Sequence, residues 1–255
     1  MSDARCVCAL AGGVWIAVGV GAAGAEPITT TFESLVHGEI ITNQFADVGL
    51  QISAVNFQLP GAMPIAFDSQ MLGTSDPDLQ GPSWATGNLA PDTVLGKVII
   101  VPENMVDADG DGIVDDPDDE GSRPAGEIVL TFDDVMTGFG FDVLDVEGVV
   151  QEMSSVEFFL FDTSVASISF NEFTDPNSEY YDPTIVFGDN SANRISPITV
   201  NSGGPLGAGQ GSGFNKVVLH LGGSSAYDNF VIIPTPSGAA VLILGGLGFG
   251  TRRRR

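Results

Sequence analysis

The stretch from residue 127 to 132 reads Glu-Ile-Val-Leu-Thr-Phe, in which Ile128, Leu130 and Phe132 stand at every second position. Successive side chains of a β-strand point to opposite faces of a sheet, so these three share one face. The stretch from 139 to 143 shows the same alternation of bulky apolar residues. A period of two of this kind predicts β-strands that each bury one face.

The same pattern extends along the chain from residue 26 to residue 233. Clusters of Gly, Pro, Asn and Asp separate the apolar stretches, for example at 73–81 and 207–213. Many short strands with frequent turns predict one all-β domain over 26–233, an antiparallel two-sheet β-sandwich of the jelly-roll kind. Further strands are expected at 28–33, 48–55, 94–101, 154–161, 167–170, 184–188, 195–200, 216–221 and 226–233.

The charge balance restricts the kinds of partner this protein can have. The 255 residues include 9 Lys and Arg against 33 Asp and Glu, a net charge of −24. Arg5 and the four arginines at 252–255 account for most of the basic residues. The clustered cations that phosphate binding requires are therefore missing from the body, and nucleic acid is not expected as a partner. The acidic residues favour either divalent cations or simple solubility.

The first 25 residues have the features of a secretory signal peptide. Arg5 precedes an apolar stretch at 7–22, and Ala23-Gly24-Ala25 offers a cleavage site with small residues at Ala23 and Ala25. The competing interpretation, a buried N-terminal helix, is disfavoured by the glycines in this stretch. The only two cysteines, Cys6 and Cys8, lie in this segment, so the processed protein is expected to fold without disulfides.

The C-terminal residues 234–255 have three parts. A Pro-Thr-Pro-Ser motif is followed by an apolar run at 238–250 and by a terminal arginine cluster. The run is shorter than the roughly 20 residues of an ordinary spanning helix, but arginines can reach the membrane surface and fix the orientation. The sequence therefore predicts a short transmembrane segment; an ordinary tail anchor is the alternative.

This three-part tail resembles the PEP-CTERM sorting signal, although Thr235 stands where that family usually has Glu. The resemblance implies recognition and cleavage by an exosortase-type enzyme in the inner membrane. It also implies only transient membrane attachment, and a final place at the cell surface or in an exopolysaccharide matrix. The residues that carry it are Pro234, Thr235, Pro236, Ser237, Arg252, Arg253, Arg254 and Arg255.

Parts of the body are also similar to secreted PEP-CTERM β-sandwich domains. The resembling segments are 31–33, 48–53, 117–126 and 222–230. That group is similar to galactose-binding and other carbohydrate modules, which often hold a structural calcium ion between the first and last strands. The resemblance implies such a site at Glu33 and Asp228. The alternative is that Asp228 merely ends a turn.

Residues 107–118 carry the clearest chemical motif, Asp-Ala-Asp-Gly-Asp-Gly-Ile-Val-Asp-Asp-Pro-Asp. Acids at alternate positions of a tight loop can converge on one hard cation, and Gly112 stands where the loop must turn. The spacing predicts a calcium site whose ligands are the carboxylates of Asp107, Asp109, Asp111, Asp115 and Asp118 and the carbonyl of Ile113.

The loop resembles the calcium loops of EF-hands. It is closer to those of thrombospondin type 3 repeats and dockerin modules, because strand-like segments flank it and Asp118 replaces the usual Glu. A structural role for calcium is expected, since extracellular modules bind it at about 10⁻⁴–10⁻³ M. The alternative is an open acidic loop held apart by repulsion between its charges.

No catalytic motif accompanies these features, and His37 and His220 lack metal-ligand spacing. The sequence thus favours a non-enzymatic exported surface or matrix protein stabilised by calcium. The alternative is a carbohydrate-binding module for extracellular polysaccharide, with Trp84, Tyr180 and Tyr181 as a stacking platform unless these aromatic residues pack in the core. A hydrolase is the least favoured interpretation.

Overall fold

The computed structural model describes residues 26–148, 153–200 and 213–235. The predicted signal peptide with its predicted cleavage site and the tail from Pro236 onward lie outside these ranges. The elements are β1 (Ile28–Thr30), η1 (Ala46–Val48), β2 (Leu50–Asn56), β3 (Ile65–Asp68), β4 (Lys97–Ile100), β5 (Gly126–Leu144), β6 (Ser155–Leu160), β7 (Thr163–Ser169), α2 (Phe170–Thr174), β8 (Ala192–Thr199), β9 (Phe214–Leu221) and β10 (Ala226–Pro234).

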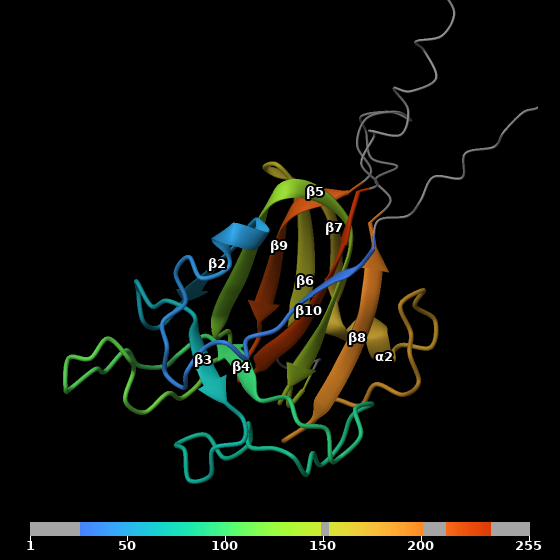
Figure 1. The fold of residues 1–255 in the computed structure, drawn as a ribbon. Coiled ribbons are helices and arrows are strands. Elements are labelled where there is room, and N and C mark those ends of the chain that lie inside the picture. The colour runs from blue at the N-terminus through green and yellow to red at the C-terminus, as the bar shows by residue number, and fades with distance from the viewer. Residues whose placement is uncertain (1–25, 149–152, 201–212, 236–255) are drawn as a thin grey trace, which may run out of the picture. The chain divides into compact units, whose positions relative to one another are not determined.

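The long strand β5 belongs to both layers of the fold. Its first half pairs with β2 and β9, and β9 continues to β6 and β7. Its second half pairs with β8 and β10, and β10 continues to β1, β4 and β3. The pairing with β9 shifts between Thr131 and Met136, where β5 arches from one layer to the other (Figure 1). All pairings between the strands are antiparallel, which confirms the predicted β-sandwich.

Aromatic side chains fill the space between the layers. Phe139, Phe158, Phe214 and Phe230 are fully buried. Phe158 and Phe214 meet edge to face with ring centroids 4.9 Å apart, a geometry that adds to the gain from burial. The apolar side chains whose alternation predicted the strands thus point into this core.

The layer formed by the second half of β5 with β8, β10, β1, β4 and β3 is called the second layer. It also buries its outer face. In β4, Ile99 belongs to the main core, whereas Val98 and Ile100 join a second cluster with Trp84. Trp84 lies in the connection between β3 and β4, so that connection covers the outer face of the layer. Strands buried on both faces lose the simple alternation of apolar and polar residues.

Several strand predictions need correction. The stretches 127–132 and 139–143 are one strand, because β5 bends through a bulge and not a turn. The predicted strand at 184–188 is not formed, β3 was not predicted, and the first strand stops at Thr30. The strand at 167–170 ends at Ser169, because Ser169 and Glu172 form a capping box that starts α2.

No helix within the described ranges is long and apolar enough to cross a membrane. The apolar run at 238–250, where the transmembrane segment was predicted, lies outside those ranges.

The register places several loops at one end of the sandwich. Gly126 pairs with Leu221 and Leu144 pairs with Ala226. Four residues join Leu221 to Ala226, so β5 begins and ends at the same end of the molecule. The segment before β5, the segment after it and the β9–β10 crossing therefore meet there.

Candidate metal centres

The acidic loop leaves the sandwich between β4 and β5 and is anchored at two places. At its base, the backbone N–H of Glu103 donates to the carbonyl of Asp118 at 2.9 Å. Near its tip, the buried Val114 donates its N–H to the carbonyl of Gly38 at 2.9 Å. The loop is therefore held against the domain in this arrangement.

Carboxylates inside the loop are oriented by backbone N–H groups. Asp107 Oδ1 accepts from Gly110 N at 2.7 Å and Asp107 Oδ2 accepts from Gly112 N at 2.9 Å. The hydrogen bond from Gly112 is the largest cause of a lowered Asp107 pKa. Gly112 has a φ of +89°, the left-handed region that favours glycine. Asp115 Oδ2 accepts from Ala108 N at 2.7 Å.

Three of the predicted ligands come together in this loop. One carboxylate oxygen each from Asp107, Asp109 and Asp115 lie within 4.8 Å of one another. Calcium–oxygen distances are about 2.3–2.6 Å, so a single calcium ion could contact all three. The donor set, all hard oxygens, fits calcium. We call these three residues the loop site.

The other three predicted ligands, Asp111, Ile113 and Asp118, are not members of this converging group. Asp111 Oδ1 accepts from Ile113 N at 2.9 Å and is not one of the three converging carboxylates. Asp118 groups with Asp76 and Asp119, because the bonded base of the loop directs it toward the sandwich. Ile113 forms a β-bridge with Glu39.

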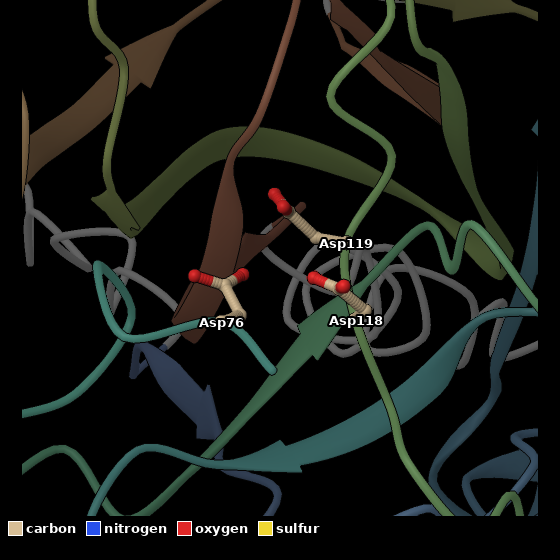
Figure 2. Close-up of side chains that lie close together, drawn as sticks. All are labelled: Asp76, Asp118 and Asp119. Atoms are coloured by element: carbon tan, nitrogen blue, oxygen red, sulfur yellow. The ribbon is translucent and has the colours of Figure 1, made fainter. Parts of the chain in front are cut away.

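A second group of carboxylates lies at the end of the sandwich where the loops meet. Asp76 comes from the β3–β4 connection, and Asp118 and Asp119 come from the segment that leads to β5 (Figure 2). One oxygen from each lies within 4.8 Å of the others. Asp76 and Asp119 are each only 6% exposed. We call these three residues the buried acidic cluster.

The two oxygens of Asp76 differ in their surroundings. Asp76 Oδ1 accepts long hydrogen bonds from Asp78 N at 3.2 Å and from Leu79 N at 3.3 Å. Asp76 Oδ2 is buried, and no donor among the described residues reaches it when both carboxyls are ionised; a hydrogen bond between the Asp76 and Asp119 side chains, which needs a proton on one of them, contributes to the raised pKa of Asp119. Buried carboxylate oxygens are normally satisfied, so this oxygen calls for a ligand or a proton.

The hydroxyl of one serine lies within hydrogen-bonding distance of two carboxylates. Ser224 Oγ lies 2.9 Å from Asp119 Oδ2 and 2.8 Å from Asp145 Oδ2. A hydroxyl carries a single proton and can donate it to only one of them at a time. Asp119 also accepts from Ser225 N at 2.6 Å, and Asp145 accepts from Asn190 N at 2.7 Å.

The electrostatic environment of this region disfavours ionised carboxyls. Burial, followed by the charge of Asp76, raises the pKa of Asp118 to about 6. Burial raises the pKa of Asp145 to about 7 and that of Asp119 well above its usual range. The adjoining cavity of about 290 Å³ has seven acidic side chains and no Lys or Arg among the described residues that line it. Arg123, which pairs with the lining Glu147, is not one of them.

Sequence reasoning missed Asp76, Asp119 and Asp145 as members of a site. They stand 26 to 69 positions apart along the chain, and only the closure of the sheets brings them together. Acidic residues are common throughout this chain, so no local pattern distinguished them.

Asp228, predicted by resemblance to pair with Glu33 around calcium, lies within β10 and does not end a turn. It is 1% exposed, and its Oδ1 has no hydrogen-bond partner among the described residues. Burial raises its pKa to about 8, with contributions from Asp142 and Glu33. Asp142 is itself paired with Arg194 at 2.7 Å. Glu33 accepts from Lys97 N at 3.1 Å.

The predicted aromatic platform does not form as expected. Trp84 is 4% exposed, and its Nε1 donates to the carbonyl of Thr93 at 2.9 Å. Tyr180 packs partly buried against the main core, and Tyr181 is 41% exposed. Because Trp84 packs in the second core cluster, it cannot stack on a sugar at the surface.

No protein-family model matches the chain, and no curated protein sequence matches it. Among solved structures, the chain is similar to the K2 cleaved adhesin domain of Lys-gingipain. The TM-score is 0.38 and the sequences are 12% identical; the match covers 81% of this chain and 99% of that one.

Proposed function

We propose that this chain is a non-enzymatic exported protein of the cell surface or exopolysaccharide matrix, stabilised by calcium at the loop site. The observation that carries this proposal is the convergence of Asp107, Asp109 and Asp115 within one calcium-sized space. Nothing in that arrangement requires a substrate, so the role proposed for the ion is structural.

Calcium at the loop site would stabilise the domain through the two anchors of the loop. Carboxylates that converge without a cation repel one another, which opposes the folded loop. A bound ion removes that repulsion and favours the conformation in which Val114 docks beside Gly38. Binding at about 10⁻⁴–10⁻³ M would fill the site outside the cell, where calcium is abundant.

The proposed route to the surface rests on the sorting tail. Its motif begins where the last strand ends: Pro234 closes β10, and Thr235 donates its N–H to the carbonyl of Val135 at 3.2 Å. An exosortase-type enzyme is the proposed processing partner. If it acts here, replacing Arg252–Arg255 with Ser in a host that has such an enzyme should leave the precursor uncleaved. Cleavage unchanged in size and rate would contradict this route.

Thermal unfolding of the purified full chain tests the calcium proposal. At calcium near 100 times Kd, linkage predicts about 2.7 kcal/mol of added stability, a midpoint rise of several degrees. In Asp109→Asn calcium should raise the unfolding midpoint by less than in the wild type, because the loop site no longer contributes. Asp162→Asn, in the β6–β7 turn, serves as a charge-matched control and should keep the whole rise. A wild-type midpoint that does not respond to calcium or to chelator would overturn the proposal.

A further inference from the structure

We propose that the buried acidic cluster of Asp76, Asp118 and Asp119 is a second divalent-cation site, separate from the loop site and selective for calcium. The cluster shares no residue with the loop site, although Asp118 stands at the end of the acidic loop (Figure 2). Its ligands come from two segments more than 40 residues apart in the sequence.

The first argument is the unpartnered oxygen of Asp76. Asp76 is only 6% exposed, and no donor among the described residues reaches its Oδ2 while Asp76 and Asp119 are both ionised. The carboxylate is directed into the space that Asp118 and Asp119 also face (Figure 2). A buried acceptor left unsatisfied destabilises the folded state, and more so when it is charged. A cation between the three carboxylates satisfies this oxygen.

The second argument is the shortage of donors around the cluster. The hydroxyl of Ser224 cannot donate to Asp119 and Asp145 at once. The cavity beside the cluster is lined by acidic side chains without a Lys or Arg among the described lining residues. Buried carboxylates that stay ionised must be paired or bound to metal, and those that are not become protonated. A divalent cation supplies positive charge that the described lining residues do not.

The third argument concerns which cation fits. All three side chains offer carboxylate oxygen, a hard ligand that suits Ca²⁺ or Mg²⁺ better than softer transition metals. Glu103 and Asp145 line the same cavity and could complete the shell together with water. Calcium accepts six to eight oxygens in irregular arrangements, whereas magnesium demands a near-ideal octahedron. A site assembled from separate loops therefore favours calcium.

The test is the number of calcium ions bound per full chain, measured by equilibrium dialysis with metal analysis and by titration calorimetry. We expect two ions for the wild type, one for Asp76→Asn and one for Asp109→Asn. Asp76→Asn removes the charge with little change in volume. Asp162→Asn is the control and should retain both ions. Magnesium titrated in the same way should bind the cluster at least tenfold more weakly than calcium.

The outcomes separate this proposal from that of the loop site. One ion in the wild type, kept in Asp109→Asn and lost in Asp76→Asn, supports the cluster and contradicts the loop site. An Asp76→Asn variant that binds as many ions as the wild type, or a single ion lost only in Asp109→Asn, overturns the proposal for the cluster. A wild type that binds no calcium overturns both. If Asp76→Asn does not fold by circular dichroism, Asp118→Asn, at a partly exposed ligand, decides the question by the same counts.

Discussion

Ser75 Oγ donates to Asp116 Oδ2 at 2.6 Å, and this bond joins the β3–β4 connection to the acidic loop. Ser75 precedes Asp76 of the buried acidic cluster, and Asp116 follows Asp115 of the loop site. The two proposed calcium sites are therefore connected by one hydrogen bond and by the short chain between Asp115 and Asp118. An ion at the cluster would restrain both segments, and an ion at the loop site would restrain the acidic loop, which Ser75 holds to the β3–β4 connection.

This connection predicts that the two sites bind calcium with positive coupling. Ser75→Ala removes the hydrogen bond but no proposed ligand. We expect both ions to bind still, with the coupling between them reduced by a few-fold, and a loss of stability below about 1 kcal/mol because the bond is exposed. Calorimetric titration of the wild type and Ser75→Ala measures the change. Equal coupling in both proteins would show that the sites are independent of this bond.

The pKa values predict how the stability of the calcium-free protein depends on pH. The pKa is raised to about 6 for Asp118, about 7 for Asp145 and about 8 for Asp228, each chiefly by burial. In the unfolded chain these groups ionise near pH 4. Between about pH 4 and pH 8 the folded protein therefore binds more protons than the unfolded chain, and its stability should fall as pH rises. Carboxyls with lowered pKa, such as Asp107, affect stability only at lower pH.

Urea unfolding over this pH range checks the prediction. In chelator the midpoint should be highest near the acidic end of the range and should decrease steadily toward about pH 8. Saturating calcium should make the profile flatter, because the ion takes the place of the protons. A midpoint that rises with pH in chelator would contradict the assigned direction of the pKa shifts.

Gly112 predicts how the loop backbone affects calcium binding. A Cβ added to Gly112 meets no atom within 4 Å, so Gly112→Ala introduces backbone strain at its φ of +89° without a clash. The strain should disturb the N–H that orients Asp107 and weaken calcium binding at the loop site by roughly tenfold, about 1.4 kcal/mol. Gly61→Ala is a matched control, since Gly61 has a φ of +87° and equally open space. It should lose similar stability and bind calcium normally; a similar loss of affinity in both variants would contradict the local explanation.

The sequence predicted what is local and missed what depends on tertiary contacts. The alternation of Ile128, Leu130 and Phe132 identified a strand because one face of that strand is buried. The spacing of acids at 107–115 identified a loop whose carboxylates converge, since that geometry is set within a few residues. The bend that makes β5 one strand and the meeting of Asp76 with Asp119 depend on how the sheets close.

For Trp84 the sequence left two interpretations open, a surface stacking platform and packing in the core. The structure decides for the core, because the connection that carries Trp84 folds over the outer face of the second layer. The carbonyl of Thr93 satisfies its indole N–H, which allows the ring to be buried. No local pattern reveals such a partner in advance.

Asp228 allows a decisive test of the ion that the resemblance places between it and Glu33. Without an ion, a buried Asp228 whose pKa is about 8 must be protonated at neutral pH, at a cost that an amide does not have. Asp228→Asn should then stabilise the protein at about pH 7.5 by on the order of 1 kcal/mol, equally in calcium and in chelator. If calcium binds there, the same variant loses a ligand, so the stabilisation seen in chelator should disappear or reverse in calcium. Urea midpoints in both solutions decide between these outcomes, and Asp162→Asn, which changes the same charge in the β6–β7 turn, should leave both midpoints within about 0.5 kcal/mol of wild type.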